Sequence, residues 1–206
     1  MLTKKTKKTV SFLASGRGSN FKAVADKIIS GNIKATPGIL ICDKPDAAAF
    51  EKAAKLGIDS IFIDPKAFAS KADYEKEMIK HFDRYKTDYI VAAGYMRILS
   101  DEIIQHYKNR IINIHPSLLP AFQGRDAQNQ AIEYGVKITG CTTHFIDEGT
   151  DTGPIILQRA INVNKKDTVH TLADRILKEE HKILVKSIKL LCDGKIEVRG
   201  RHVIIH

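Results

Sequence analysis

Short apolar runs alternate with amphipathic stretches along the first half of the chain, and this alternation constrains the fold more than any other feature. The apolar runs predict strands at residues 9–15, 37–43, 58–64, 88–94 and 110–115. Apolar residues at helical spacing predict helices at residues 20–29, 45–57, 70–85 and 100–107. Strands and helices in such alternation form a mostly parallel twisted sheet with helices on both faces. We therefore expect a Rossmann-like α/β fold for this half, with ligand sites at the carboxyl ends of its strands.

The pattern changes after Pro120. A helix is predicted at residues 125–135, and two long strands at 136–146 and 153–163 are joined by a short loop, which predicts an antiparallel pair. A long amphipathic helix is predicted at residues 168–191 with Asp167 as its N-cap, followed by a small hairpin at 194–205. We expect one α/β domain across residues 1–206, with antiparallel strands in its C-terminal half.

The formal net charge of +9 is partly concentrated at the start of the chain, in Lys4, Lys5, Lys7 and Lys8. We expect residues 1–8 to be a disordered leader, because a basic leader is most often solvated and frayed. A signal peptide is not expected, because the apolar run from Val10 to Ala14 is too short and Arg17 follows it. No basic run is interleaved with aromatic residues, and no apolar run approaches the length that spans a membrane. Neither a nucleic acid nor a membrane is therefore an expected partner.

The cysteines are isolated from one another and from histidine clusters: they are Cys42, Cys141 and Cys192. This spacing argues against a structural zinc site or a disulfide framework. Free cysteines suit a reducing compartment, so we expect a cytoplasmic protein without a metal.

A glycine-rich turn follows the first strand, in the stretch "SFLASGRGSN" that ends at Asn20. A strand, a glycine turn and a helix in this order present backbone N–H groups and the positive helix end to an anion. The stretch lacks the lysine of a Walker A loop and the third glycine of a dinucleotide fingerprint, which favours the phosphate of a smaller ligand. Ser19 or Asn20 is the expected N-cap. The alternative is a plain strand–helix turn that uses glycine for tight packing.

An amide and an imidazole end the predicted strand at 110–115, in the stretch "NIHPSLLP". Alternation along a strand places Asn113 and His115 on the same face. Pro116 biases His115 toward extended geometry and so fixes the direction of the imidazole. An amide donor beside a proton-transfer group suits attack on a carbonyl-type carbon, because the amide stabilises the oxyanion and the imidazole moves the proton. The alternative is a strand end with a structural histidine.

Asp151 lies between glycines in the loop "DEGTDTGP", which joins the two long strands. A carboxylate there would orient His115, favour its imidazolium and raise its pKa. The alternative is an acidic turn, since aspartate and glycine are common turn residues.

The stretch "AAGYMRILS" at 92–100 follows the end of another predicted strand. Arg97 is its one charged residue in an otherwise apolar segment, and such a segment would suit a flat, mostly apolar pocket. The alternative there is core packing with Arg97 turned to solvent.

Together these stretches resemble the phosphoribosylglycinamide formyltransferase family of purine synthesis, which is folate-dependent. "SGRGSN", "GYMRILS", "NIHPSLLPAFQG" and "DTGPIILQ" occur in the order and at the spacing of that family, from about Val10 to the tail. The resemblance implies the formyltransferase fold. It also implies direct transfer of a formyl group from 10-formyltetrahydrofolate to the amine of glycinamide ribonucleotide, without a metal, in a monomer or homodimer.

The resemblance also implies roles for individual residues. The implied catalytic residues are Asn113, His115 and Asp151. The implied substrate-binding residues are Gly18, Ser19 and Asn20 for the ribose phosphate, and Glu180 near the glycinamide amine. The implied folate-binding residues are Met96, Arg97, Ile98 and Leu99, with Lys71 toward the folate tail, where some members carry arginine.

Three rival functions are weighed against this one. Formyltetrahydrofolate deformylase hydrolyses the same donor, usually behind an N-terminal regulatory domain, whereas here the first strand is expected near residue 9. Methionyl-tRNA formyltransferase adds an RNA-binding domain for which we expect no room. A non-catalytic nucleotide-binding module would leave Asn113, His115 and Asp151 without a shared purpose.

Overall fold

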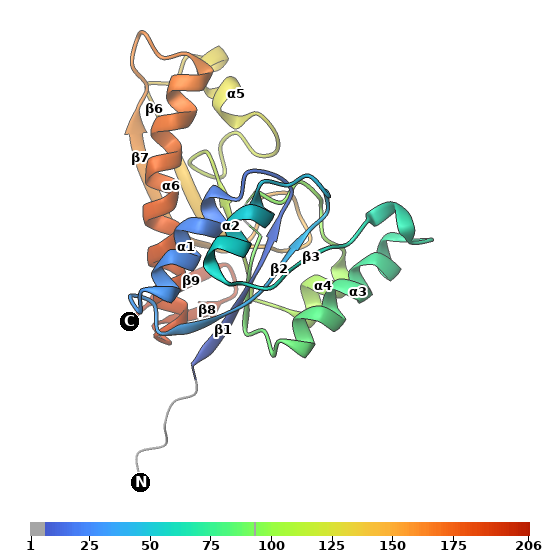
Figure 1. The fold of residues 1–206 in the computed structure, drawn as a ribbon. Coiled ribbons are helices and arrows are strands. Elements are labelled where there is room, and N and C mark those ends of the chain that lie inside the picture. Colours follow the sequence, from blue (N-terminus) through green and yellow to red (C-terminus); the bar gives the residue numbers. More distant parts are fainter. Residues whose placement is uncertain (1–6, 93) are drawn as a thin grey trace.

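A seven-stranded sheet forms the centre of the fold, with the strand order β3-β2-β1-β4-β5-β6-β7 (Figure 1). The structure, a computed structural model, describes residues 7–92 and 94–206. The sheet strands are β1 (Lys8–Ala14), β2 (Ala35–Cys42), β3 (Ser60–Phe62), β4 (Tyr89–Val91), β5 (Ile111–His115), β6 (Ile138–Phe145) and β7 (Ile155–Asn162). Strands β1 to β5 pair in parallel, and β6 pairs antiparallel with both β5 and β7. The predicted α/β fold with antiparallel strands in its C-terminal half is therefore confirmed.

The helices cover both faces of the sheet, as Figure 1 shows. They are α1 (Ser19–Ile29), α2 (Ala49–Leu56), α3 (Lys71–Arg84), α4 (Asp101–His106), α5 (Ala127–Tyr134) and α6 (Val169–Cys192), with a short 3-10 turn at Pro65–Ala67. The alternation in β1 divides its side chains between two cores. Val10 and Phe12 pack with residues of α1, α2 and α6, whereas Leu13 packs with residues of α3 and α4.

The chain ends in a separate hairpin of β8 (Ile196–Arg199) and β9 (His202–Ile205), as the sequence predicted. The hairpin contacts β7. None of the helices in the described residues is long and apolar enough to cross a membrane.

Two predicted helix caps are wrong. Helix α1 begins after Gly18, which adopts the left-handed conformation at φ 63°, and neither Ser19 nor Asn20 caps it. The Asn20 side chain turns instead to Glu180. Helix α6 is capped by the Thr168 hydroxyl, which accepts from the Thr171 N–H at 3.2 Å, and not by the preceding aspartate.

The predicted leader, residues 1–8, extends one residue too far, into the first strand. Lys8 is the first residue of β1, and its ammonium lies 2.8 Å from the Asp88 carboxylate. The other oxygen of Asp88 accepts from the Thr9 N–H at 2.8 Å, so this aspartate fixes the start of the strand. Residues 1–6 of the predicted leader lie outside the described residues.

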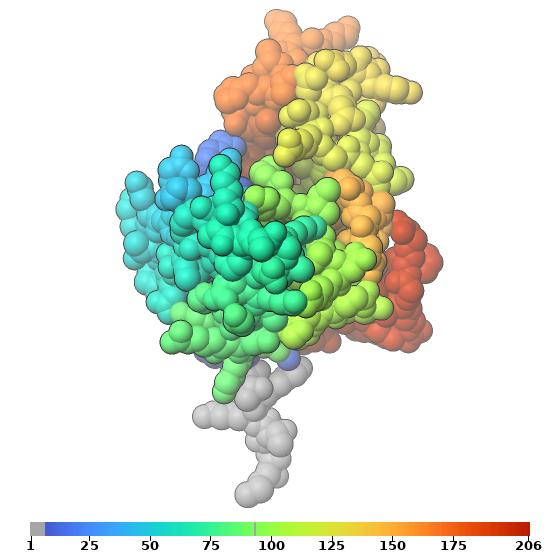
Figure 2. Space-filling model, turned by 90° about the vertical axis from the view of Figure 1, so that its right-hand side faces the viewer, coloured from blue at the N-terminus to red at the C-terminus, as the bar shows by residue number. Residues whose placement is uncertain are grey.

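The order of the strands indicates where in the sheet a ligand would bind. Strand β1 lies between β2 and β4, so the direction in which the chain adds strands reverses beside it. In open α/β sheets, ligands bind in the crevice outside the carboxyl ends of the strands at such a reversal. In Figure 2 the surface is hollowed between the green part of the chain and the yellow part that contains α5.

Candidate active site

One cavity of about 1020 Å³ opens at the carboxyl ends of β1, β4 and β5. It is large enough for two ligands of small-molecule size. All residues with a predicted catalytic or binding role line it: Gly18, Ser19, Asn20, Lys71, Met96, Arg97, Ile98, Leu99, Asn113, His115, Asp151 and Glu180. Residues as far apart in the sequence as Gly18 and Glu180 thus meet around one space.

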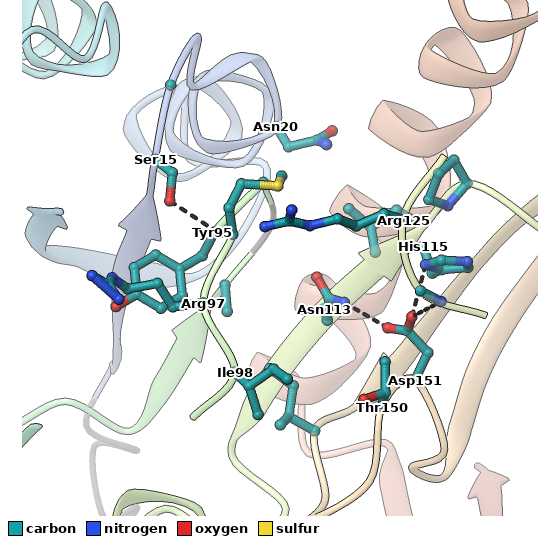
Figure 3. A pocket seen from close by; sticks show the side chains of 18 of the residues that line it. Ser15, Asn20, Tyr95, Arg97, Ile98, Asn113, His115, Arg125, Thr150 and Asp151 are labelled. Carbon is teal, nitrogen blue, oxygen red and sulfur yellow. Dashed lines mark hydrogen bonds and ion pairs between the residues drawn. The ribbon is translucent and has the colours of Figure 1, made fainter. Parts of the chain in front are cut away.

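His115 and Asp151 form a close pair on one wall of the cavity (Figure 3). The Asp151 Oδ2 atom lies 3.2 Å from His115 Nδ1 and accepts from the Gly124 N–H at 2.9 Å. The other ring nitrogen of His115, Nε2, lies 2.7 Å from the Phe122 carbonyl oxygen. Both ring nitrogens therefore face oxygen acceptors, and only the imidazolium donates to both.

Burial opposes that charged form of His115. Desolvation lowers its pKa, while the Phe122 carbonyl and the Asp151 carboxylate act to raise it, and the pKa remains below its ordinary value. Asp151 therefore acts on the pKa of His115 in the predicted direction, but burial outweighs it. The Asp151 carboxyl is also partly buried, but hydrogen bonds from His144 and the Gly124 N–H, with the nearby His115, hold its pKa below its usual range.

Asn113 and His144 complete this cluster. They are direct partners across the antiparallel β5–β6 pair, with Asn113 Nδ2 at 3.3 Å from His144 Nε2 and 3.5 Å from Asp151 Oδ1. His144 Nε2 lies 3.6 Å from Asp151 Oδ1, and His144 Nδ1 donates to the Phe145 carbonyl at 2.9 Å. Asn113 and His115 sit on the same face of β5, as predicted, and the loop after β6 brings Asp151 to both.

The loop that carries Asp151 has a fixed shape. Asp151 itself adopts a left-handed conformation at φ 54°, which is strained for a residue other than glycine. A Cβ atom at Gly153 would lie 1.9 Å from the Phe145 carbonyl oxygen, so only glycine permits the return of the loop to β7. The Thr152 carbonyl accepts from Arg201 of the terminal hairpin at 2.9 Å. These contacts hold the carboxylate toward His115.

The glycine loop lies across the cavity from this cluster. A Cβ atom at Gly18 would lie 2.7 Å from that of Ala49, so Gly18 allows the loop to pack against α2. A Cβ atom at Gly16 would meet no heavy atom within 4 Å. Tight packing, the alternative to phosphate binding at this turn, thus explains Gly18. Gly16 lines the cavity, and packing does not require a glycine there.

Asn20 and Glu180 meet on this side of the cavity, from α1 and α6. The Asn20 amide donates to Glu180 Oε2 at 3.0 Å, and both side chains are buried. Burial raises the pKa of Glu180, against the opposite effects of Asn20 and Arg17. The Asn20 Oδ1 atom is buried and has no hydrogen-bond partner among the described residues. A ligand N–H or O–H group would satisfy it.

The segment after β4 presents apolar side chains to the cavity. Met96 is 59% exposed and Ile98 is 69% exposed, whereas Leu99 turns into the core at 5%. Arg97 pairs with Asp43, with 3.2 Å between Nε and Oδ2, and its guanidinium lies 5.9 Å from the centre of the Tyr74 ring. Two exposed apolar side chains beside a cavity suit a flat, largely apolar ligand.

Comparisons with known proteins identify the family of the chain. Residues 8–188 match the family described as formyl transferase. The chain is 45% identical over 184 residues to the phosphoribosylglycinamide formyltransferase of Bacillus subtilis (strain 168), which covers 89% of this chain and 94% of the relative. The chain belongs to the formyl transferase family. The resemblance found in the sequence motifs is confirmed, and so is the prediction of an enzyme that transfers a formyl group.

Solved structures of family members have the same fold. The crystal structure of glycinamide ribonucleotide transformylase 1 from Symbiobacterium toebii matches with a TM-score of 0.96 and 40% identity, and covers 100% of this chain and 97% of that chain. A formyltetrahydrofolate deformylase from Pseudomonas syringae pv. tomato str. DC3000 matches with a TM-score of 0.90 but 25% identity, and covers 98% of this chain and 66% of that chain. The transformylase is thus the nearer relative of the two.

Sequence reasoning missed several groups of this formyl transferase site. The clearest is His144, whose signal is its place opposite Asn113 once the predicted strands are paired in register. The Phe122 carbonyl and the Gly124 N–H are backbone groups of a loop, and no side-chain pattern reveals them. Within the described residues, no cluster of three or more His, Cys, Asp or Glu side chains is placed to hold a metal ion.

Proposed function

We propose that this formyl transferase moves the formyl group of 10-formyltetrahydrofolate to the amine of glycinamide ribonucleotide, through Asn113, His115 and Asp151. The observation that carries the proposal is the meeting of these three side chains on one wall of a cavity whose other wall is the glycine loop. That arrangement offers a proton-transfer group and an amide at one end and an anion-binding turn at the other.

The ribonucleotide takes the side of the cavity lined by Gly18, Ser19 and Asn20. Its phosphate meets the N-terminus of α1, where free N–H groups and the helix dipole favour an anion. Its amine extends toward Glu180, whose buried carboxyl is hydrogen-bonded to Asn20. An amine must be neutral to attack, and the Glu180 carboxyl offers an oxygen that can accept a hydrogen bond from its N–H group.

The folate takes the side lined by Met96, Arg97, Ile98 and Leu99, with Lys71 at the end where its glutamate tail leaves the cavity. The exposed side chains of Met96 and Ile98 supply the apolar surface for the ring system. Lys71 supplies a positive charge for the tail but not the bidentate fork of an arginine.

The transfer proceeds by direct attack. The amine nitrogen bonds to the formyl carbon, and the carbonyl oxygen becomes an oxyanion that the Asn113 amide and protonated His115 stabilise. The bond from the formyl carbon to N10 then breaks, and a proton passes from the former amine to N10, with His115 as the carrier. Asp151 orients the His115 ring through Nδ1 and stabilises its imidazolium form.

This role requires one exchange of partners at His115. Its Nε2 atom lies 2.7 Å from the Phe122 carbonyl, which holds the position that an oxyanion would take. When the formyl donor binds, its carbonyl oxygen replaces the Phe122 carbonyl as the partner of Nε2. The exchange replaces a neutral acceptor with a developing negative charge, so the hydrogen bond strengthens as the reaction proceeds.

The experiment that tests this function measures consumption of 10-formyltetrahydrofolate with and without glycinamide ribonucleotide. We expect rapid consumption only with the ribonucleotide, and one formylated product for each donor consumed. Equal loss of donor in the absence of the ribonucleotide would instead show a deformylase. No consumption in either case would contradict both functions.

A further inference from the structure

Glu75 is a buried carboxylate at the edge of the cavity, and the proposed chemistry gives it no part. It lies on α3 with a side chain 2% exposed, and it lines the cavity beside Lys71. We propose that Glu75 is a positioning residue for the folate: it fixes the segment Met96–Ser100 and thereby sets the affinity for the formyl donor. This inference rests on the proposed function for the identity of that ligand.

The side-chain hydrogen bonds of Glu75 within the described residues all come from the end of that segment. Both carboxylate oxygens accept from the Ser100 N–H at 3.1 Å, and Oε2 also accepts from the Ser100 hydroxyl. Ser100 precedes α4 but its side chain makes no capping hydrogen bond to that helix, because the hydroxyl is directed to Glu75. Charge-assisted hydrogen bonds of this kind are stronger than neutral ones.

The neighbouring cation is Lys71, one turn earlier on α3. Its ammonium lies 3.9 Å from Glu75 Oε1, and its side chain is 50% exposed. A carboxylate is costly to bury without a compensating charge and hydrogen bonds. Lys71 provides the charge and Ser100 the hydrogen bonds for Glu75. The Glu75 carboxylate is therefore a buried group with both kinds of partner, and not half of a surface ion pair.

Two further contacts hold the rest of the segment. The Met96 N–H donates to the Ser15 hydroxyl at 2.9 Å, just after β1, and Arg97 pairs with Asp43 just after β2. Met96 and Ile98 remain exposed between these points. Exposed apolar side chains tend to turn toward other apolar surface, so a segment that presents two of them to a cavity must be held by other contacts. Glu75 supplies the contact at its C-terminal end.

The test is Glu75→Gln, which nearly keeps the shape, removes the charge and leaves one acceptor oxygen in place of two for the Ser100 donors. We expect the Kd for tetrahydrofolate and the KM for the formyl donor to rise by roughly tenfold or more, as loss of a hydrogen bond to a charged group implies. The kcat and the KM for the ribonucleotide should stay within about twofold of the parent. The reason is that Glu75 contacts the segment Met96–Ser100 and not the glycine loop, where the ribonucleotide is proposed to bind.

Glu77→Gln is the matched control on the same helix. Its carboxylate faces Lys80 and His81, away from Ser100, so the control should leave all of these constants unchanged. Ser100→Ala removes only the hydroxyl donor and should raise the same two constants by a smaller factor. It decides the question if Glu75→Gln does not fold.

An unchanged Kd for tetrahydrofolate in either folded variant would overturn the inference, and so would an equal rise in the KM of both substrates. Calorimetric titration of tetrahydrofolate needs no turnover. Failure of the parent enzyme to transfer formyl would therefore count against the proposed function alone, while the titration still reports on Glu75.

Discussion

At the scale of single residues, Asp151 is the group whose removal is most informative. Its carboxylate acts to raise the pKa of His115 while burial lowers it. Asp151→Asn removes the charge and nearly keeps the shape, so the pKa of His115 should fall further. If protonated His115 stabilises the oxyanion, as proposed, the alkaline limb of the kcat profile should move to lower pH. The loss of kcat at neutral pH should be about 10²–10⁴-fold.

A pH series of kcat on the parent and on Asp151→Asn measures both effects. Low activity with an unshifted alkaline limb would mean that Asp151 only shapes the loop. Full activity in the variant would mean that this aspartate has no part in catalysis.

Asn113 carries a separate prediction. Its amide lies within 3.5 Å of Asp151 Oδ1 and can turn to the oxyanion without a change in β5. Asn113→Ala should lower kcat by about 10²–10³-fold, as loss of an oxyanion donor does in other enzymes. Single-turnover kinetics at saturating substrates measure this loss, and the melting temperature is the control for folding. A variant within a few-fold of the parent would assign Asn113 a structural role.

At the scale of elements, the proposed phosphate site can be tested separately from the packing of the glycine loop. A side chain at Gly18 would strain its left-handed backbone and contact Ala49, so Gly18→Val would disturb the fold and test nothing specific to phosphate. Gly16→Ala places a methyl group in open space at the cavity wall. It should raise the KM for the ribonucleotide several-fold and leave the KM for the folate unchanged. Initial-rate kinetics that show both constants equally raised would contradict a phosphate site at this turn.

Helix α6 gives a prediction about stability. Thr168 caps its N-terminus, and the helix carries Glu180 to the cavity. Thr168→Ala should lower the free energy of unfolding by about 0.5–2 kcal/mol, the usual effect of losing such a cap. Urea denaturation measures this change. A free energy of unfolding that Thr168→Ala leaves unchanged would contradict the assignment of this residue as the cap.

At the scale of the whole molecule, the sequence predicted the sheet because buried parallel strands read as continuous apolar runs between helical patterns. It also predicted Asn113 and His115 on one face, since alternation along a strand is a local property. The sequence does not reveal His144 or Glu75 as residues of the cavity. The position of His144 depends on the register of β5 and β6, and that of Glu75 depends on a contact between α3 and a distant loop. The cap at Thr168 was misplaced by one residue, since two adjacent polar side chains compete for that position.

Direct transfer of the formyl group from folate to amine is the reaction proposed for the Asn113–His115–Asp151 cluster. The most direct measurement is transfer of a ¹³C-labelled formyl group in the presence of a large excess of unlabelled formate, with the product examined by mass spectrometry. Direct transfer predicts a ribonucleotide product with undiluted label in the parent enzyme, and a rate reduced by orders of magnitude in His115→Ala. Product whose label is diluted by the unlabelled formate, or label recovered as free formate, would contradict the claim.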